Sequence, residues 1–236
     1  MKNKNSNWRQ WFFLLGIIGA IQFVVLTILA MYFYDGGTLH QRELRGYSFL
    51  LNYFSDLGRT IDFRGAPNDL PRNLFRMALS ISGGCLILFF FALPGIFNNK
   101  VAKGLAILTG LFGLVAAVSY IAIANIPWNV NYRGHVYYVR IGFLAFLLVT
   151  IFYSLAILLE PRYPRRYAVA FLVFALILAA QISIMFFGPR AYRSEDALFL
   201  QVVAQKIVVY SQILCLLYQS IGALKFSRSA TIRNGD

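Results

Sequence analysis

The chain has 236 residues, of which 59% are hydrophobic and only 13% are charged, and its formal net charge is +13. About a quarter of the residues of a soluble domain are charged, so this composition excludes an ordinary soluble protein and predicts one integral membrane domain over residues 1–236. The basic residues gather mainly in the connections on one side of the predicted membrane, which is a topology signal rather than a nucleic-acid-binding pattern. We therefore expect membrane lipids, and no nucleic acid, as partners. The sequence leaves the oligomeric state open.

Six long apolar segments follow one another along the chain. A hydrocarbon layer of about 30 Å needs roughly 20 apolar residues in a helix, and each segment is about that long. The first segment is too long for a signal-peptide core and has no cleavage site after it, so we expect it to remain as a helix. The predicted fold is all-α, a six-helix transmembrane bundle, with helices at about residues 11–34, 74–97, 104–127, 136–159, 166–188 and 195–224.

The charges in the connections predict the orientation of the bundle. With the N-terminus inside, the inner segments carry eleven Lys and Arg residues against two acids, whereas the outer segments carry eight against seven. Short loops rich in Lys and Arg stay in the cytoplasm, so both termini should be cytoplasmic, in a cell (inner) membrane. Several of the inner charges lie near the chain ends, namely Lys2, Lys4, Arg233 and Asp236.

The first connection, residues 35–73, is an outer loop of 39 residues. Loops of this length are usually functional or disordered, and this one is too aromatic and aliphatic to be disordered. Its apolar residues recur at the spacing of one helix face and predict a short amphipathic helix; they are Tyr47, Leu50, Leu51, Phe54 and Leu57. We expect this helix to lie on the outer surface or to fold into the mouth of the bundle. Gly58 should end it with a left-handed cap.

The third and sixth segments carry two further patterns. Small residues let membrane helices approach closely, and the third segment has such a stripe at Ala106, Gly110, Gly113, Ala117 and Ala124. The sixth helix should begin near Ser194, an N-cap residue followed by two acids. Its polar stripe favours interhelical hydrogen bonds, with the wall of a hydrated cavity as the alternative; the stripe is Gln201, Gln205, Gln212 and Gln219.

Three basic residues intrude at the outer ends of the second, fourth and sixth helices, namely Arg76, Arg140 and Lys206. Each alone could snorkel to the headgroups, but intramembrane cations usually pair with a carboxylate or line a site. Asp56 is the expected partner, within salt-bridge range of at least one of them. We predict an outward-facing pocket between these helices, with the loop as its lid, that binds a lipid or other amphiphile with an anionic head. Its residues are Asp56, Arg76, His135, Tyr138, Arg140, Gln205 and Lys206.

The sequence offers little for catalysis, and we leave open whether the protein is an enzyme. A Gly-x-Ser-x-Gly nucleophile motif is absent. A zinc site needs at least three protein ligands, but His40 and His135 are the only histidines, no His-x-x-x-His motif is present, and Cys215 lies near the middle of the membrane. Asp56 and His135 are weak catalytic candidates. We expect no cofactor and no metal; a metal held by Asp56, His135 and one further oxygen ligand is the less favoured alternative.

The first loop also carries a resemblance to a known family. The motifs are Gly46-Tyr47-Ser48-Phe49, then Asn52-Tyr53-Phe54-Ser55-Asp56-Leu57-Gly58-Arg59-Thr60, then Pro67-Asn68, with Pro127-Trp128 and His135 further along. They resemble the bacterial and archaeal membrane proteins grouped as domain of unknown function nine-nine-eight. The Ser-Asp-x-Gly element is also similar to the damage-regulated autophagy modulators and the GPI-anchor remodelling membrane proteins. The resemblance implies a fold and a motif location, but it brings no activity.

Two alternatives to amphiphile binding remain at this point. The polar stripe of the sixth helix would suit a small-solute transporter, although transport sites usually need polar groups at matching depth on several helices. The second alternative is structural: Asp56 and the basic residues would only lock the loop onto the bundle.

Overall fold

The computed structural model of the protein describes residues 7–233, and side chains over residues 8–229. Lys2, Lys4 and Asp236 lie outside the described residues, as does the side chain of Arg233. The described part forms six long helices, each long and apolar enough to cross a membrane, so the predicted fold of a multi-pass helical membrane protein is confirmed. They are α1 (Asn7–Phe33), α2 (Asp69–Ala92), α3 (Lys100–Asn125), α4 (Tyr132–Leu159), α5 (Arg166–Phe187) and α6 (Glu195–Arg233).

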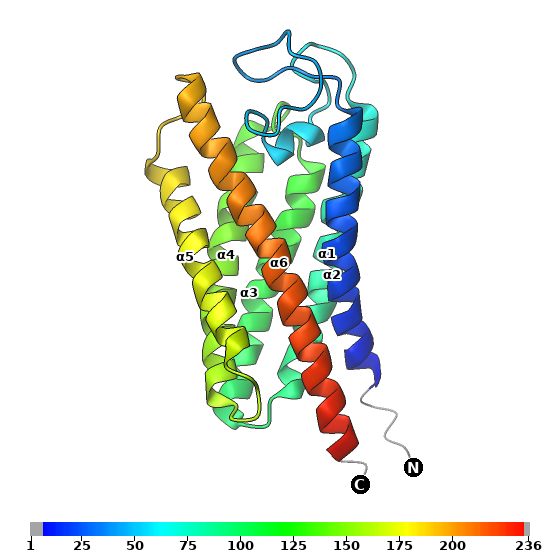
Figure 1. Ribbon diagram of the computed structural model, residues 1–236, viewed down its shortest axis with the longest axis vertical. Helices are drawn as coiled ribbons and strands as arrows, with labels where there is room; N and C mark the ends of the chain where they lie inside the picture. Colours follow the sequence, from blue (N-terminus) through cyan, green and yellow to red (C-terminus); the bar gives the residue numbers. More distant parts are fainter. Residues whose placement is uncertain (1–6, 234–236) are drawn as a thin grey trace.

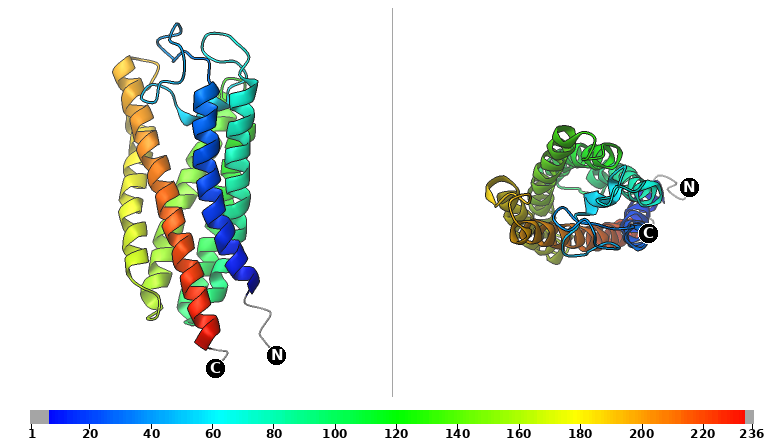
Figure 2. Two further views of the ribbon diagram at one scale, coloured as in Figure 1. Left: turned by 45° about the vertical axis from the view of Figure 1, so that its right-hand side comes forward. Right: turned by 90° about the horizontal axis from the view of Figure 1, so that it is seen from above.

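The helices form a closed ring. Each helix packs against the next one in sequence, and α6 packs back onto α1 (Figures 1 and 2). The start of α1 and the end of α6 lie at one end of the bundle, which we call the terminal end, and the long connection between α1 and α2 lies at the other, the loop end (Figure 1). Helix α6 is inclined, so that it lies beside α5 at the loop end and approaches α1 at the terminal end (Figure 1).

Helices α1, α3 and α4 begin four residues earlier than predicted, and the larger differences are at α2 and α6. Helix α2 begins at Asp69, five residues earlier than expected, because Pro71 falls in its first turn, where the missing N–H costs no hydrogen bond. Helix α6 begins at Glu195 as predicted, and the Ser194 hydroxyl accepts a hydrogen bond from the backbone N–H of Ala197 at 3.1 Å. It continues to Arg233, beyond the apolar segment, because polar residues extend the helix outside the expected span.

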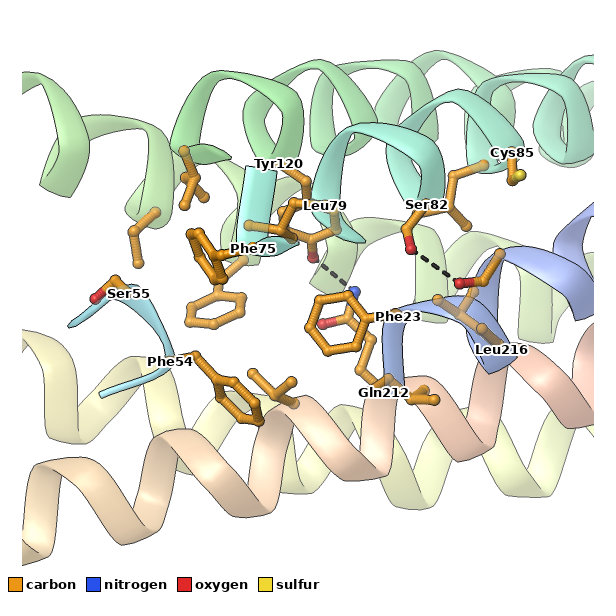
Figure 3. Close-up of a pocket in the computed structure, with 18 of the residues that line it drawn as sticks. Phe23, Phe54, Ser55, Phe75, Leu79, Ser82, Cys85, Tyr120, Gln212 and Leu216 are labelled. Carbon is orange, nitrogen blue, oxygen red and sulfur yellow. Dashed lines mark hydrogen bonds between the residues drawn. The ribbon is translucent and has the colours of Figure 1, made fainter. Parts of the chain in front are cut away.

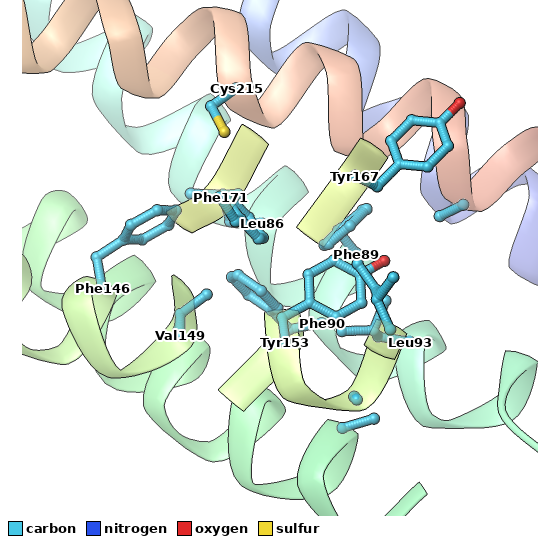
Figure 4. Packing of buried hydrophobic residues seen from close by; sticks show 14 of the residues in the cluster. Leu86, Phe89, Phe90, Leu93, Phe146, Val149, Tyr153, Tyr167, Phe171 and Cys215 are labelled. Carbon is cyan, nitrogen blue, oxygen red and sulfur yellow. The ribbon is translucent and has the colours of Figure 1, made fainter. Parts of the chain in front are cut away.

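The half of the bundle near the terminal end is filled by aromatic side chains from several helices (Figure 4). Phe89 and Phe90 of α2 pack edge to face, and Tyr153 of α4 packs against Phe171 of α5. Gly113 of α3 lies against the Phe90 ring, and this ring occupies the space that a Cβ atom at position 113 would need. The predicted small-residue stripe is therefore a packing face between α3 and α2.

Glu160 fastens the connections at the terminal end to one another. Its side chain is 3% exposed and accepts hydrogen bonds from the backbone N–H groups of Asn98 and Asn99, at 3.0 and 3.3 Å, and from Arg162 at 3.2 Å. Burial raises the pKa of this carboxyl, but the two backbone N–H groups and Arg162 outweigh it and hold the pKa below its ordinary value. The α2–α3 and α4–α5 connections are thus joined through one carboxylate.

The connection at the loop end folds into the mouth of the bundle, one of the two positions expected for it. Its helical part is shorter than predicted, because only Phe54–Gly58 forms a 3-10 helix, η2. Phe54 and Leu57 of η2 are buried with Phe23 of α1 and Phe75 of α2. The left-handed cap at Gly58 is wrong, since Gly58 is not among the residues with positive φ. Gly58 instead makes room for the Phe75 ring, which approaches the position of an added Cβ to 2.8 Å.

Candidate functional site

Asp56 lies at the centre of the loop end and is 1% exposed. Its carboxylate accepts hydrogen bonds from the backbone N–H of Tyr53 at 2.8 Å, the side-chain amide of Asn52 at 3.2 Å and the indole N–H of Trp128 at 3.0 Å. Burial raises the pKa of Asp56 above its ordinary value, although these hydrogen bonds and the charge of Arg59 act in the opposite direction. The carboxylate therefore fixes the fold of η2 and ties it to the α3–α4 connection.

The expected salt bridge of Asp56 is wrong. Within the part of the chain that the structure describes, no cation lies within ion-pair distance of Asp56; the salt bridges found there involve other acids. The physical reason is that neutral N–H donors already occupy both carboxylate oxygens. Arg76 instead donates to the side-chain oxygen of Asn125 at 3.1 Å, and Arg140 lies over the Phe186 ring at 5.0 Å.

Lys206 of α6 is buried and holds the loop directly. Its ammonium nitrogen donates to the Tyr47 hydroxyl at 2.6 Å and to the backbone carbonyl of Asn52 at 2.7 Å. It also lies 4.3 Å from the centre of the Phe54 ring, a cation–π distance. Burial raises the pKa of Tyr47, so its hydroxyl stays protonated and donates a hydrogen bond to the backbone carbonyl of Asn52. The partners of the Lys206 ammonium group are thus neutral oxygen atoms and aromatic rings rather than a carboxylate.

Asn52 connects the Lys206 and Asp56 groups; it belongs to the motif of the family resemblance but was not among the predicted site residues. Its amide nitrogen donates to Asp56 and to the carbonyl of Gly37, while its amide oxygen accepts from the backbone N–H of Ser48. The signal that could have found it is its position four residues before Asp56, on one turn of a compact loop. Trp128, which follows Pro127 in the α3–α4 connection, likewise belongs to that motif but was not among the predicted site residues.

The loop fills the space between α6 and α1 at the loop end of the ring (Figure 1). Tyr210 of α6 contacts both Phe49 and Phe54, and Phe54 also contacts Phe23 of α1. The backbone N–H of Phe54 donates to the side-chain oxygen of Gln205 at 2.9 Å. The loop is therefore anchored to α6 by two side chains that are adjacent in sequence, Gln205 and Lys206.

A cavity of about 120 Å³ lies beneath η2, between α1, α2, α3, α4 and α6 (Figure 3). Its wall is largely apolar and includes Phe23, Phe75 and Leu79, as Figure 3 shows. The polar groups at its upper margin are Ser55 of η2, His135 of α4 and Gln205 of α6. The cavity reaches down to Gly16, Cys85 and Leu216, near the middle of the helices. The loop half of the bundle therefore contains a cavity, whereas the terminal half carries the cluster of buried aromatic side chains described above.

The structure separates the seven predicted site residues into three groups. His135 and Gln205 line the cavity. Asp56 and Lys206 hold the loop that covers it. Arg76, Tyr138 and Arg140 lie elsewhere, on α2 and α4, where Tyr138 packs against Tyr137. The predicted space between α2, α4 and α6 exists, but it is bounded by α1 and α3 as well, and charged side chains are not among its lining residues.

The other glutamines of α6 make interhelical hydrogen bonds. Gln201 donates to the carbonyl of Ile184 at the end of α5, Gln212 donates to the Tyr120 hydroxyl of α3, and Gln219 donates to the carbonyl of Tyr167 in α5. These contacts agree with the interpretation of the stripe as a hydrogen-bonding seam.

His135 makes one hydrogen bond that defines its chemistry. Its Nδ1 lies 2.7 Å from the carbonyl oxygen of Ile126, so Nδ1 must carry a proton. The other ring nitrogen, Nε2, is then an acceptor in the neutral ring, and it has no hydrogen-bond partner among the described residues. Across residues 8–229, no group of three His, Cys, Asp or Glu side chains is arranged to hold a metal ion.

Comparisons of this protein with known protein families, curated proteins and solved structures find no match. The family resemblance of the first loop therefore stays a prediction.

Proposed function

We propose that the protein binds a membrane amphiphile whose apolar chain occupies the cavity beneath η2. The observation that supports this proposal is the cavity itself, which holds about 120 Å³ of space behind a wall made largely of Phe, Leu, Ile and Val side chains, with Ser82, Tyr120 and Gln212 as polar members. Apolar cavities of roughly 150 Å³ stay dry and take up hydrophobic molecules. For a protein with six membrane-spanning helices, the most abundant hydrophobic molecules nearby are lipid chains.

The polar groups at the margin of the cavity favour an acidic head. Ser55 offers a hydroxyl, and Gln205 offers its amide N–H₂, because its amide oxygen is occupied by the backbone N–H of Phe54. His135 offers the Nε2 acceptor, which can accept a hydrogen bond from the O–H of a protonated acid group. A carboxylic or similarly acidic group would satisfy all three, whereas an alkyl or ester end would leave them without partners.

The proposal can be tested with purified full-length protein in maltoside micelles, titrated with a pyrene-labelled fatty acid. We expect saturable binding. Filling the cavity with Val139→Trp should weaken it by about tenfold or more, equivalent to about 1.4 kcal/mol. The control is Val173→Trp, because Val173 is 54% exposed on the surface of α5 and does not line the cavity.

A pyrene-labelled fatty alcohol of the same length tests the head separately. It should bind more weakly than the acid to the wild type, and His135→Phe should reduce this difference. Equal binding by Val139→Trp, Val173→Trp and the wild type would show that the probe only partitions into the micelle, and the proposed function would then be wrong.

A further inference from the structure

A second pocket lies on the other side of η2, at the surface of the loop. It is open and about 850 Å³ in volume, and its walls come from the α1–α2 connection and the α3–α4 connection. Its lining includes Arg59, Phe63 and Trp128, none of which lines the cavity inside the bundle. Asp56, bonded to the Trp128 indole, stands between the two spaces. The surface pocket is therefore a separate site.

Arg59 is the notable group in this pocket. It is only 8% exposed, and its guanidinium lies between two aromatic rings, 4.0 Å from the centre of Phe63 and 4.4 Å from the centre of Trp128. The Nε atom donates to the backbone carbonyl of Ile61 at 3.0 Å. These three contacts fix the plane of the guanidinium and use one of its five N–H groups.

The remaining N–H groups of Arg59 have no hydrogen-bond acceptor among the described residues, and no carboxylate there lies within 4.0 Å. Asp56 and Asp62 are close enough to act on Arg59 through their charge, but neither lies within ion-pair distance of it. The Oδ1 atom of Asp62 accepts from the backbone N–H groups of Arg64 and Ala66, and its Oδ2 atom is buried without a hydrogen-bond partner among the described residues. A buried cation with an unused, rigid pair of donors matches the geometry of carboxylate and phosphate groups, which arginine binds through two parallel hydrogen bonds.

The other charges of the pocket restrict the kind of anion. Arg64 lines the pocket but is paired with Asp35 at 3.5 Å, while Arg42 and Glu43 line it as exposed residues. Three basic and three acidic side chains line the pocket altogether. The acids would therefore repel a multiply charged anion. A singly charged oxyanion at Arg59 would be balanced by the positive charge of the guanidinium.

We propose that the surface pocket binds a singly charged oxyanion, a phosphodiester or a carboxylate group, through paired hydrogen bonds from the Arg59 guanidinium. The Phe63 and Trp128 rings hold Arg59 in place, and the site is open to a lipid headgroup at the membrane surface and to a small solute. This inference goes beyond the proposed function and stands without it, because the two spaces share no lining residue.

Trp128 provides a direct reporter of this site. The only other tryptophans, Trp8 and Trp11, lie near the start of α1, so the full-length protein with W8F and W11F retains Trp128 as its single tryptophan. In maltoside micelles, which carry no phosphate, we would record Trp128 fluorescence while adding dimethyl phosphate, acetate or phosphatidylglycerol. A saturable change with the soluble anions indicates a solute site, and a change only with phosphatidylglycerol indicates a headgroup site; either result supports the proposal.

Variants separate binding at Arg59 from diffuse electrostatics. Arg59→Gln should weaken the response by about tenfold or more, as expected for the loss of paired charge-assisted hydrogen bonds. Arg64→Gln, the matched control in the same pocket, should change it little because Arg64 is already paired. Glu43→Gln, at an exposed position that does not endanger folding, should tighten binding by about two- to fivefold.

The absence of any saturable Trp128 response in the wild-type background would overturn the proposal. So would equal effects of Arg59→Gln and Arg64→Gln, or no tightening in Glu43→Gln. If Arg59→Gln does not fold, the wild-type titration and the Glu43→Gln comparison still decide the question.

Discussion

Replacing Asp56 by alanine should release the loop from the bundle without unfolding the helices. The substitution leaves the backbone N–H of Tyr53 and the indole N–H of Trp128 without their acceptor, whereas Asn52 keeps its bond to the Gly37 carbonyl. Each buried donor left unpaired costs about 1–3 kcal/mol. Removing the carboxylate also ends the cost of burying its charge, which is what raises the pKa of Asp56. We therefore expect a value near the lower limit of the sum, about 2 kcal/mol.

This cost should appear as faster amide hydrogen exchange in the loop. A loss of about 2 kcal/mol in the free energy of local opening corresponds to roughly 30-fold faster exchange. The amides to follow are Phe54, which is bonded to Gln205, and Arg59, which is bonded to the carbonyl of Asp56. Helix amides near Phe90 in the aromatic half serve as the internal reference and should be unchanged.

Asp69→Ala is the matched control, because Asp69 is an exposed acid that pairs with Arg72 at 2.9 Å. Exposed pairs of this kind contribute about 0–1 kcal/mol, so loop exchange should barely change. If Asp56→Ala leaves loop exchange within the range of the Asp69→Ala control, the role assigned here to the carboxylate is refuted.

Three further predictions concern other parts of the molecule. Glu160→Gln should lower the thermal stability in micelles at neutral pH. Because the folded-state pKa of Glu160 lies below its ordinary value of about 4.3, the stability difference between the variant and the wild type should shrink as the pH falls below about 4.3 toward the folded-state pKa. A difference that does not depend on pH would contradict the role of the carboxylate. Gly113→Ala should lower the unfolding temperature, because the new Cβ collides with Phe90, whereas Gly104→Ala on the same helix meets no atom within 4 Å and should be neutral or stabilising. For the predicted orientation, a cysteine at Glu43 should react with a membrane-impermeant maleimide from outside the cell and one at Lys100 should not; the reverse pattern would invert the topology.

The fold was predictable because hydrophobic length and helix signals are local. The six apolar segments predicted the six helices, Ser194 predicted the start of α6, and the glycines and alanines of α3 predicted a close-packed face. The boundary of α2 was less accurate because Pro71, which ends helices in many contexts, here lies within a first turn.

The site was less predictable because its partners are distant in sequence. Charge alone suggested a pair between Asp56 and a cation, but the structure satisfies Asp56 with neutral N–H donors and satisfies Lys206 with oxygens and rings. Such a solution depends on how residues 47–58 fold against residues 128 and 206, and no local pattern encodes that arrangement. His135 and Gln205 line one cavity, and their depth along α4 and α6 could be read from the sequence because it follows from helical rise.

The difference between the loop half of the bundle, which contains the cavity, and the terminal half, which contains the buried aromatic cluster, has a mechanical consequence. Densely packed aromatic cores have low compressibility, and the Glu160 hydrogen bonds further join the connections at the terminal end. A change in the cross-section of the bundle is therefore least opposed at the loop end, where the loop rather than a helix separates α6 from α1 (Figure 2). Widening there turns a cylinder into a wedge, so the area that the protein occupies changes in one leaflet and not in the other. Lateral pressure and curvature in that single leaflet would then change the free energy with which the loop binds between α6 and α1.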